Sequence, residues 1–572
     1  MNMLRTFETH QIRKTMELSS CLWDFQTLPE EGEGFQGKMM VPGCWETCPD
    51  TRKYRGKARY EKTVVCGGSV RFEFKGVSHT AQIYLDGKEL ACHYNAYTPF
   101  DAVARGLPWG EHRLEVYVDN SFGPQSALHV PNDYQTYGGI TRPVVMEELG
   151  EAYLSRLFFT PVYREGGWYF SVKAKVGSLT EEDFAGRVEF YLDRKPCRVG
   201  SGEARPLASV RTDAAGKAVF EAASGELPFD GAQAWSPEEP VLYFLTAVLF
   251  NENGEAIDDL TDRVGFREVR TEGKNILLNG KRLRIKGFCR HEDHPQFGCS
   301  LPLEAMQQDL LLIREMGGNS VRTSHYPNDE RFLDLCDELG ILVWEENHAR
   351  GLSEENMRNP HFERQCEDCI REMLENHYNH PSIYIWGILN ECASHTEYGR
   401  ECYRKQLELI RQLDPFRPRS FASCQFKTDL CLDLPEVVSY NIYPLWYHDT
   451  PVEEYLSDLY EWVQKESGGG DKPFLITEVG AGAVYGYRTP DRVKWSEEYQ
   501  AEALEKQLNA IFAQEGCSGV YIWQFCDCRV CDSWFSNRPR TMNNKGIVDE
   551  YRRPKLAWET VKRIFTGLGN VR

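Results

Sequence analysis

Two glutamates stand at the ends of apolar, strand-like runs in the second half of this 572-residue chain. Glu391 closes the run IYIWGILNE (383–391), and Glu478 lies near the end of FLITEVG (474–480). If both runs are strands of one barrel, their carboxyl ends meet at the same mouth. Hydrolysis of a glycosidic bond needs such a pair, because one carboxyl group protonates the leaving oxygen and the other attacks the anomeric carbon. The alternative is that either glutamate is a surface or ion-paired residue.

A third group that could do chemistry follows the last strand-like run, GVYIWQF (519–525). It is the segment Asn543-Asn544-Lys545-Gly546. An ammonium and an amide together would bind a carboxylate through charge-assisted hydrogen bonds. The chain carries a net charge of −20, so an anionic substrate would need a local cation of this kind. The alternative is a turn with an exposed lysine, because asparagine and glycine favour turns.

The elements that must position these residues alternate after about residue 275. Apolar runs typical of strands are separated by amphipathic stretches typical of helices, such as 304–317, 329–340 and 499–514. Eight such units predict one (β/α)₈ barrel. The eight strand candidates are 284–288, 320–324, 341–346, 383–391, 419–424, 437–444, 474–480 and 519–525.

The first 270 or so residues instead predict β-sandwiches, because short strand-like runs recur between Gly, Asp and Asn. We expect one domain over 1–150, a second over 151–272 and the barrel over 273–572. The strand candidates are 70–77, 81–87, 112–120, 168–176, 186–193, 217–223 and 241–250.

Composition excludes several classes of protein. With 66 Lys plus Arg against 86 Asp plus Glu, the chain is a poor general binder of nucleic acid or anionic membrane. No run approaches the roughly 18 apolar residues of a membrane-spanning helix. The first twenty residues lack the apolar core of a secretory signal. The 19 scattered cysteines then indicate reduced thiols in a cytoplasmic protein.

Two Cys-x-x-Cys pairs raise the alternative of a structural zinc site. They are Cys366 with Cys369 and Cys528 with Cys531. Four thiols can bind Zn²⁺, but these pairs are far apart in the chain and have no histidine-rich neighbour. We therefore expect no metal and no cofactor.

Several segments resemble signatures of family 2 glycoside hydrolases. ILNECAS around Glu391 and LITEVGAG around Glu478 resemble the acid/base and nucleophile signatures, and 287–298 and 317–327 resemble two further ones. VPGCW (41–45) and NDYQTYGGITRPV (132–144) resemble the N-terminal sugar-binding-like domain. The resemblance implies a jelly-roll sandwich, an immunoglobulin-like sandwich and a TIM barrel. It also implies that Glu391 is the general acid/base and Glu478 the nucleophile of a retaining enzyme.

The segment around Lys545 resembles the Asn-x-Lys-Gly motif of the β-glucuronidases in that family, in which the Asn and Lys hold the sugar carboxylate. The resemblance therefore implies an exo-acting β-glucuronidase for small glucuronides or glucuronate-ended saccharides. Because family members often form tetramers, it also implies a homo-oligomer.

The same resemblance places further side chains around the sugar. Of two arginines that precede the motif, Arg538 and Arg540, we favour Arg540. For Asp133, His291, His325 and Trp523, ordinary structural roles remain open. The substrate-binding residues that we expect are Asp133, His291, His325, Asn390, Asn441, Tyr443, Tyr447, Trp523, Arg540, Asn543 and Lys545.

Two rival functions remain. The first is another exo-β-glycosidase of the family, a β-galactosidase or a β-galacturonidase, and the second is a carbohydrate-binding protein without turnover. Loss of Lys545 should separate uronide from neutral substrates. Release of a chromophore from an aryl glycoside that needs both glutamates should separate an enzyme from a binding protein.

Overall fold

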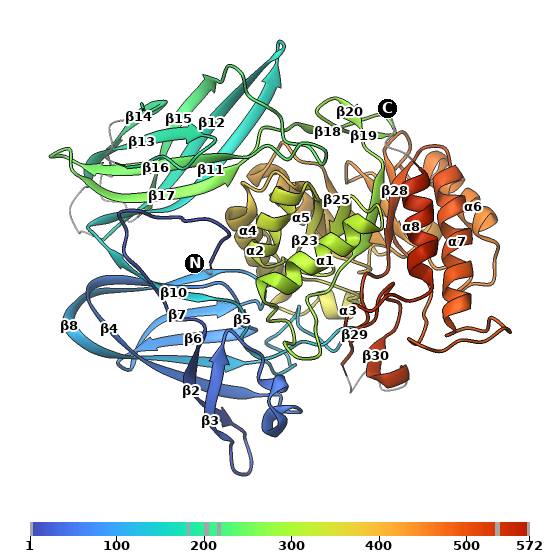
Figure 1. Cartoon of the computed structure of the whole chain (residues 1–572), viewed down its shortest axis with the longest axis horizontal. Coiled ribbons are helices and arrows are strands. Elements are labelled where there is room, and N and C mark those ends of the chain that lie inside the picture. Colours follow the sequence, from blue (N-terminus) through green and yellow to red (C-terminus); the bar gives the residue numbers. More distant parts are fainter. Residues whose placement is uncertain (1–3, 180–183, 200–204, 214–218, 532–537, 569–572) are drawn as a thin grey trace.

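The computed structural model describes residues 4–179, 184–199, 205–213, 219–531 and 538–568. Figure 1 shows two β-rich parts stacked on one side of a helical and barrel-shaped part. The expected class, two β-sandwiches followed by a TIM barrel, is confirmed. Within the described residues, no helix is long and apolar enough to span a membrane.

The first part is an eight-stranded antiparallel sheet that curls around one aromatic-rich core. Its strands β4 and β8 are far longer than the sequence predicted, because register shifts near Gly68 break the alternation of apolar residues. Two short strands, β5 (Val77–Ser78) and β9 (Gly139–Ile140), pair beside it. The strands of the large sheet are β1 (Thr15–Glu17), β2 (Cys21–Leu28), β3 (Gln36–Val41), β4 (Lys57–Phe74), β6 (Thr80–Leu85), β7 (Lys88–Tyr94), β8 (Phe100–Asp119) and β10 (Val144–Leu149).

The second part packs a three-stranded sheet against a four-stranded sheet. The first two residues of the expected strand 217–223 lie outside the described residues, and the rest falls in β15. The three-stranded sheet contains β11 (Ala152–Arg164), β12 (Gly167–Ser178) and β15 (Val219–Pro228). The four-stranded sheet contains β13 (Ala185–Asp193), β14 (Ala208–Asp213), β16 (Tyr243–Asn251) and β17 (Ala256–Val264). A small sheet of β18 (Val269–Glu272), β19 (Asn275–Leu278) and β20 (Lys281–Arg282) leads into the barrel.

Eight parallel strands close the barrel, and each overlaps one of the predicted runs. Every residue of these strands is buried, so most of their positions are apolar, which is why the sequence reveals them. The strands are β21 (Ile285–Cys289), β22 (Ser320–Arg322), β23 (Leu342–Glu346), β24 (Ile383–Ile388), β25 (Arg419–Ser423), β26 (Val438–Asn441), β27 (Phe474–Val479) and β28 (Cys517–Ile522).

The helices around the barrel begin and end at residues suited to those positions. The Asp329 carboxylate caps α2, and Gly340 ends that helix at a φ of 68°. Thr396 and Ser496 cap α5 and α7. The helices are α1 (Leu303–Glu315), α2 (Glu330–Leu339), α3 (Glu354–Met357), α4 (Phe362–His377), α5 (Glu397–Leu413), α6 (Val452–Lys465), α7 (Glu497–Ala513) and α8 (Ala557–Gly567).

Candidate active site

The two predicted glutamates converge at the carboxyl-terminal mouth of the barrel. Strands β26 and β27 pair Asn441 with Glu478 in register, and the Asn441 amide donates to Glu391 Oε1 over 2.9 Å. Tyr443 Oη donates to Glu478 Oε2 over 2.6 Å. Asn441 thus pairs with Glu478 through the backbone and with Glu391 through its side chain. The Glu391 charge acts on Glu478, so the two carboxyl groups are close enough to suit a single anomeric centre.

The backbone around Glu391 is strained. The sequence predicted a strand through residue 391, but β24 ends at Ile388 because Leu389 and Glu391 have φ values of 43° and 53°. Residues other than glycine rarely adopt this left-handed region, and such strain persists where the surroundings impose it. The turn leaves the Glu391 side chain at the mouth, where it is 19% exposed.

The second glutamate is almost fully buried, and its titration follows from that burial. Desolvation and the neighbouring Glu391 charge raise the pKa of Glu478 to about 7, while Arg322 and the Tyr443 hydroxyl oppose the rise. Two close carboxyl groups resist sharing two negative charges, so the pair holds one proton near neutral pH. A pair in that state offers one acid and one carboxylate, as hydrolysis requires.

Sequence analysis did not identify Arg322, a barrel-strand residue that holds the Glu478 carboxylate in position. The Arg322 guanidinium is fully buried and donates to Glu478 Oε1 over 2.8 Å, to both Glu346 oxygens over 2.9 Å and to Asn390 Oδ1 over 2.7 Å. Its only sequence signal is the arginine in the strand-like run at 320–324. The network leaves Asn390 Nδ2 without a partner among the described residues.

Two predicted histidines line the wall beside Trp523. The His325 ring stacks on Trp523 at 4.9 Å, and the His291 ring meets that indole edge-on at 5.4 Å. Burial lowers the pKa of both histidines well below the usual range, so both rings are neutral. Neither Nε2 atom has a hydrogen-bond partner within the described part of the chain, so both are available to a hydroxyl group.

The predicted Lys545 lies in a cage of aromatic rings. Its ammonium is 5.5, 5.8 and 5.1 Å from the rings of Tyr443, Trp446 and Tyr447, and it donates to Tyr447 Oη over 2.9 Å. The residue is 2% exposed, and no carboxylate of the described residues pairs with it. A buried ammonium with only aromatic and hydroxyl partners is suited to an anionic group of a ligand.

The loop that carries Lys545 is held by backbone contacts. Gly546 N donates to Asp527 Oδ1 over 2.8 Å, and Lys555 pairs with the same oxygen at 2.7 Å. A Cβ at Gly546 would lie 2.3 Å from the Asp527 nitrogen, so only glycine fits there. Gly546 therefore lets the loop pack closely against Asp527, and this packing fixes the position of the neighbouring Lys545.

The two candidate arginines have different partners: Arg538 contacts Asp133, whereas Arg540, which the sequence analysis favoured, does not. Arg538 Nη2 lies 2.7 Å from Asp133 Oδ2, and Asn543 Nδ2 donates to the same oxygen over 3.1 Å. Arg540 instead pairs with Glu550 and is 41% exposed. Arg540 has a φ of 63°, so the chain turns sharply at this residue. The spacing of the two arginines did not indicate this turn.

A loop of the first sandwich completes the mouth. It brings Asp133 to Arg538 and Asn543, and it brings Asn132 to Arg350, whose Nη1 donates to Asn132 Oδ1 over 2.7 Å. Arg350 also lies 3.5 Å from Glu391. Sequence analysis missed Arg350, although its place shortly after the third barrel strand could have indicated it.

The described residues offer one cluster with the spacing of metal ligands, and it contains no cysteine. It consists of Asp334, Asp337 and His380, all buried. Arg5 already pairs with Asp334 at 2.8 Å, and His380 lies 2.6 Å from Asp337. These carboxylates are therefore compensated, and the proposed cysteine pairs do not form a cluster among the described residues.

Comparison with known proteins defines the class. The family described as "Glycosyl hydrolases family 2, TIM barrel domain" matches residues 269–570, and "Glycosyl hydrolases family 2" matches residues 152–267. The chain therefore belongs to glycosyl hydrolases family 2.

Three proteins that are similar to this chain indicate which activities occur among its relatives. The chain is 65% identical to a family 2 β-galacturonidase from Eisenbergiella tayi, solved bound to galacturonate, over all of both chains with a TM-score of 0.96. It is 25% identical to the Bifidobacterium dentium β-glucuronidase complexed with coumarin-3-O-glucuronide, over 99% of both chains with a TM-score of 0.85. It is 27% identical to a β-glucuronidase of Paenibacillus borealis, over 91% of this chain and 89% of that one.

Proposed function

We propose that this family 2 glycoside hydrolase is a retaining exo-β-uronidase that removes a terminal β-D-galacturonate. One observation carries the choice of a uronide: the buried Lys545 ammonium in its aromatic cage has no carboxylate partner among the described residues. A neutral sugar would leave this charge uncompensated, whereas a uronate at C6 would supply the missing anion. This argument disfavours the rival β-galactosidase.

The proposed mechanism uses the two glutamates in turn. Glu391 gives its proton to the glycosidic oxygen while Glu478 attacks the anomeric carbon, and the aglycone leaves as an alcohol. Glu391 then takes a proton from a water molecule, which displaces Glu478 and restores both groups. Asn390 Nδ2, unpaired within the described residues, is suited to the sugar 2-hydroxyl.

Glu478 is suited to the nucleophilic role because its oxygens accept from Arg322 and Tyr443. These donors stabilise a carboxylate and fix its direction. Glu391 has a more exposed position, beside the opening through which an aglycone would extend.

The choice between galacturonate and glucuronate concerns one hydroxyl group, at C4. The sequence pattern favoured glucuronate, and curated relatives named β-glucuronidase support it as the second candidate. Galacturonate is favoured by the 65% identity, over the full length, to an enzyme named a β-galacturonidase and solved with galacturonate.

The test is hydrolysis of four nitrophenyl β-glycosides: galacturonide, glucuronide, galactoside and glucoside. We expect the galacturonide to have the highest kcat/KM, and NMR of the first product to show the β-anomer. A higher kcat/KM for the glucuronide would move the assignment to the second candidate. A preference for either neutral glycoside, or an α-anomer as the first product, would refute the proposal.

We further propose a cytoplasmic homo-oligomer, with a tetramer as the expectation from family resemblance. The 19 scattered cysteines support a reducing compartment. Light scattering coupled to size-exclusion chromatography tests the assembly, and a mass equal to one chain would contradict it.

A further inference from the structure

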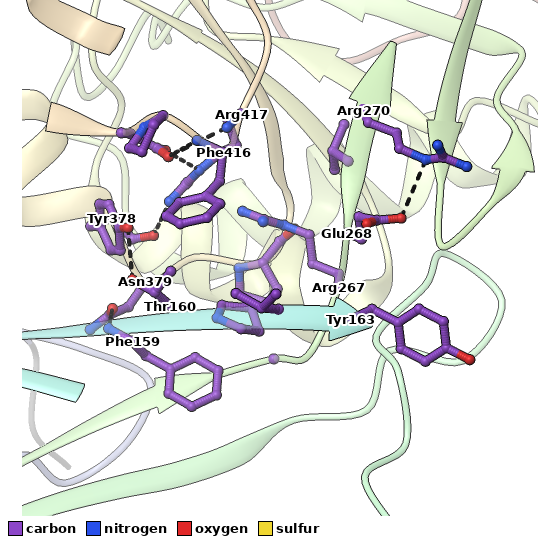
Figure 2. Close-up of a pocket in the computed structure, with 17 residues that line it drawn as sticks. Phe159, Thr160, Tyr163, Arg267, Glu268, Arg270, Tyr378, Asn379, Phe416 and Arg417 are labelled. Atoms are coloured by element: carbon purple, nitrogen blue, oxygen red, sulfur yellow. Dashed lines mark hydrogen bonds and ion pairs between the residues drawn. The ribbon is translucent and has the colours of Figure 1, made fainter. Parts of the chain in front are cut away.

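A second cationic pocket lies far from the catalytic mouth, where the second sandwich meets the barrel. It has a volume of about 220 Å³ and is lined by strand β11 and by the segments that enter β24 and β25. Figure 2 shows Arg267 extending between Phe416 and the Glu268–Arg270 pair, with Tyr163 at the edge. Because these segments precede their strands, the pocket is at the amino-terminal end of the barrel, opposite the glutamates.

Arg267 places an uncompensated charge in this pocket. The residue is 7% exposed, and its Nε and Nη2 donate only to the backbone carbonyls of Pro381 and Ile383, both over 3.2 Å. Burial, together with the neighbouring Arg417 charge, lowers the pKa of Arg267 to about 9, so the guanidinium is still charged at neutral pH. A buried charge normally has a counter-ion, and Arg267 has no ion pair with a described residue.

Arg417 is a second buried cation with unused capacity. It is 5% exposed, lies 2.6 Å from Asp414 through Nε, and donates to the Tyr378 carbonyl. Its Nη1 is buried and has no partner within the described ranges. Two guanidinium groups thus share one carboxylate, which leaves one positive charge. At the rim, Arg270 lies 3.4 Å from Glu268 and 3.1 Å from Glu272, so this exposed group has no free positive charge to add to the pocket.

The rim of the pocket offers flat apolar surfaces. Phe416 is 48% exposed and Tyr163 is 46% exposed, although both line the pocket. Aromatic faces of this kind stack on the C–H face of a pyranose ring. With a volume of about 220 Å³, the pocket suits one sugar unit rather than a long chain.

From this arrangement we propose that the pocket is a second, non-catalytic subsite for an acidic monosaccharide unit. The carboxylate lies on Arg267 and Arg417, and the ring lies against Phe416. The naming of galacturonate as the sugar rests on the proposed function, whereas the anion site itself rests on the two arginines.

The test separates the pocket from the mouth by using Lys545→Ala, which weakens uronate binding at the catalytic end. Calorimetric titrations of this variant use galacturonate, methyl β-galactopyranoside and inorganic phosphate. We expect saturable binding of galacturonate alone. Adding Arg417→Gln should weaken it at least about tenfold, the loss expected for one charge-assisted contact. Adding Phe416→Ala should also weaken it, and the rim control Arg270→Gln should not.

Hydrolysis distinguishes this proposal from the assignment of function. In the otherwise unchanged enzyme, Arg417→Gln should leave kcat/KM for the preferred uronide within about twofold, because the residue is remote from both glutamates. Absence of saturable galacturonate binding in Lys545→Ala, or binding insensitive to Phe416→Ala and Arg417→Gln, would overturn the subsite. Phosphate binding without galacturonate binding would overturn the sugar assignment.

A structure of Lys545→Ala crystals soaked in galacturonate provides an answer that does not depend on the stability of the Arg417 variant. We expect the sugar acid between Arg267 and Arg417. A sugar found only at the mouth, or nowhere in the crystal, would contradict the proposal.

Discussion

Two layers of the barrel interior treat their buried polar groups differently. In the deeper layer, Tyr521 Oη lies 2.6 Å from Ser320 Oγ and 2.9 Å from Tyr384 Oη, and Ser320 also donates to the Leu342 carbonyl. At the mouth, the Nε2 atoms of both histidines and Nδ2 of Asn390 have no hydrogen-bond partner among the described residues.

This difference indicates in which layer the buried polar groups are hydrogen-bonded without a ligand. Unpaired buried polar groups cost free energy, so a fold keeps them where a ligand will satisfy them. The deeper layer stabilises the barrel, whereas the mouth gives up stability for binding and catalysis. This view predicts that changes at the mouth lower activity without destabilising the fold, and that changes below it lower stability.

The largest expected effect is on turnover at the mouth. Glu478→Gln should lower kcat on the preferred uronide by about 10⁴-fold or more, because it removes the nucleophile. Steady-state assays with the nitrophenyl uronide measure this, with Glu408→Gln, at a partly exposed residue of α5, as a control that should retain full activity. Retention of more than a few per cent of the activity by Glu478→Gln would refute the assignment.

The next effect concerns the anion site. Lys545→Ala should lower kcat/KM for uronides by about 10²-fold to 10³-fold, the range for losing one partner of a buried charged contact. Neutral galactosides should be hydrolysed no more slowly than by the parent enzyme. Lys494→Ala is a matched control, because Lys494 lies 5.9 Å from the same Trp446 ring but is 45% exposed. An equal loss on neutral and acidic substrates would show that Lys545 has only a structural role.

The same substitution, tyrosine to phenylalanine, made once in each layer tests the comparison between the two layers directly. Tyr443→Phe removes the hydroxyl that donates to Glu478 and should lower kcat by about 10²-fold with little change in stability. Tyr384→Phe removes the hydroxyl beside Tyr521 and should cost about 1 kcal/mol of stability with kcat unchanged. Denaturant unfolding and steady-state kinetics of both variants decide, and the reverse pattern would invalidate the distinction between the layers.

Sequence alone predicted the parts that local patterns encode. The eight barrel strands were predictable because strands buried on both faces are apolar runs, and Glu391, Glu478 and Lys545 were noticed because they follow such runs. Arg322 was not predictable, since its importance lies in contacts with residues from two other strands and from the turn that follows β24.

Two further differences between the predicted and the observed structure have local causes, which the composition of the sequence does not reveal. The long strands β4 and β8 looked like shorter runs, because the glycines in β4 shift the register against β8. The chain turns at Arg540, so Arg538 and Arg540 have different surroundings although they are two positions apart. The sequence did not indicate which of the two contacts Asp133.

The two arginines supply a smaller test at the rim of the mouth. Arg538→Ala should raise KM for the preferred uronide about tenfold, since it removes one of the two partners that Asp133 Oδ2 has among the described residues. Arg540→Ala should leave KM within about twofold, because its pair with Glu550 is partly exposed. Equal effects of both variants would return Arg540 to the candidate site.

A last prediction concerns stability as a function of pH. The pKa of Glu478 is about 7 in the folded protein, above the ordinary glutamate value of 4.5, so the folded state binds more protons between those values. Stability contributed by this group is therefore full below about pH 4.5 and is lost as pH rises towards 7. Glu478→Gln removes the loss and should stabilise the fold at pH 8 by a few kcal/mol relative to its effect at pH 4.5. Urea unfolding of parent and variant at both pH values measures the difference, and an equal effect at the two values would show that Glu478 ionises without strain, contrary to the view that the mouth gives up stability for chemistry.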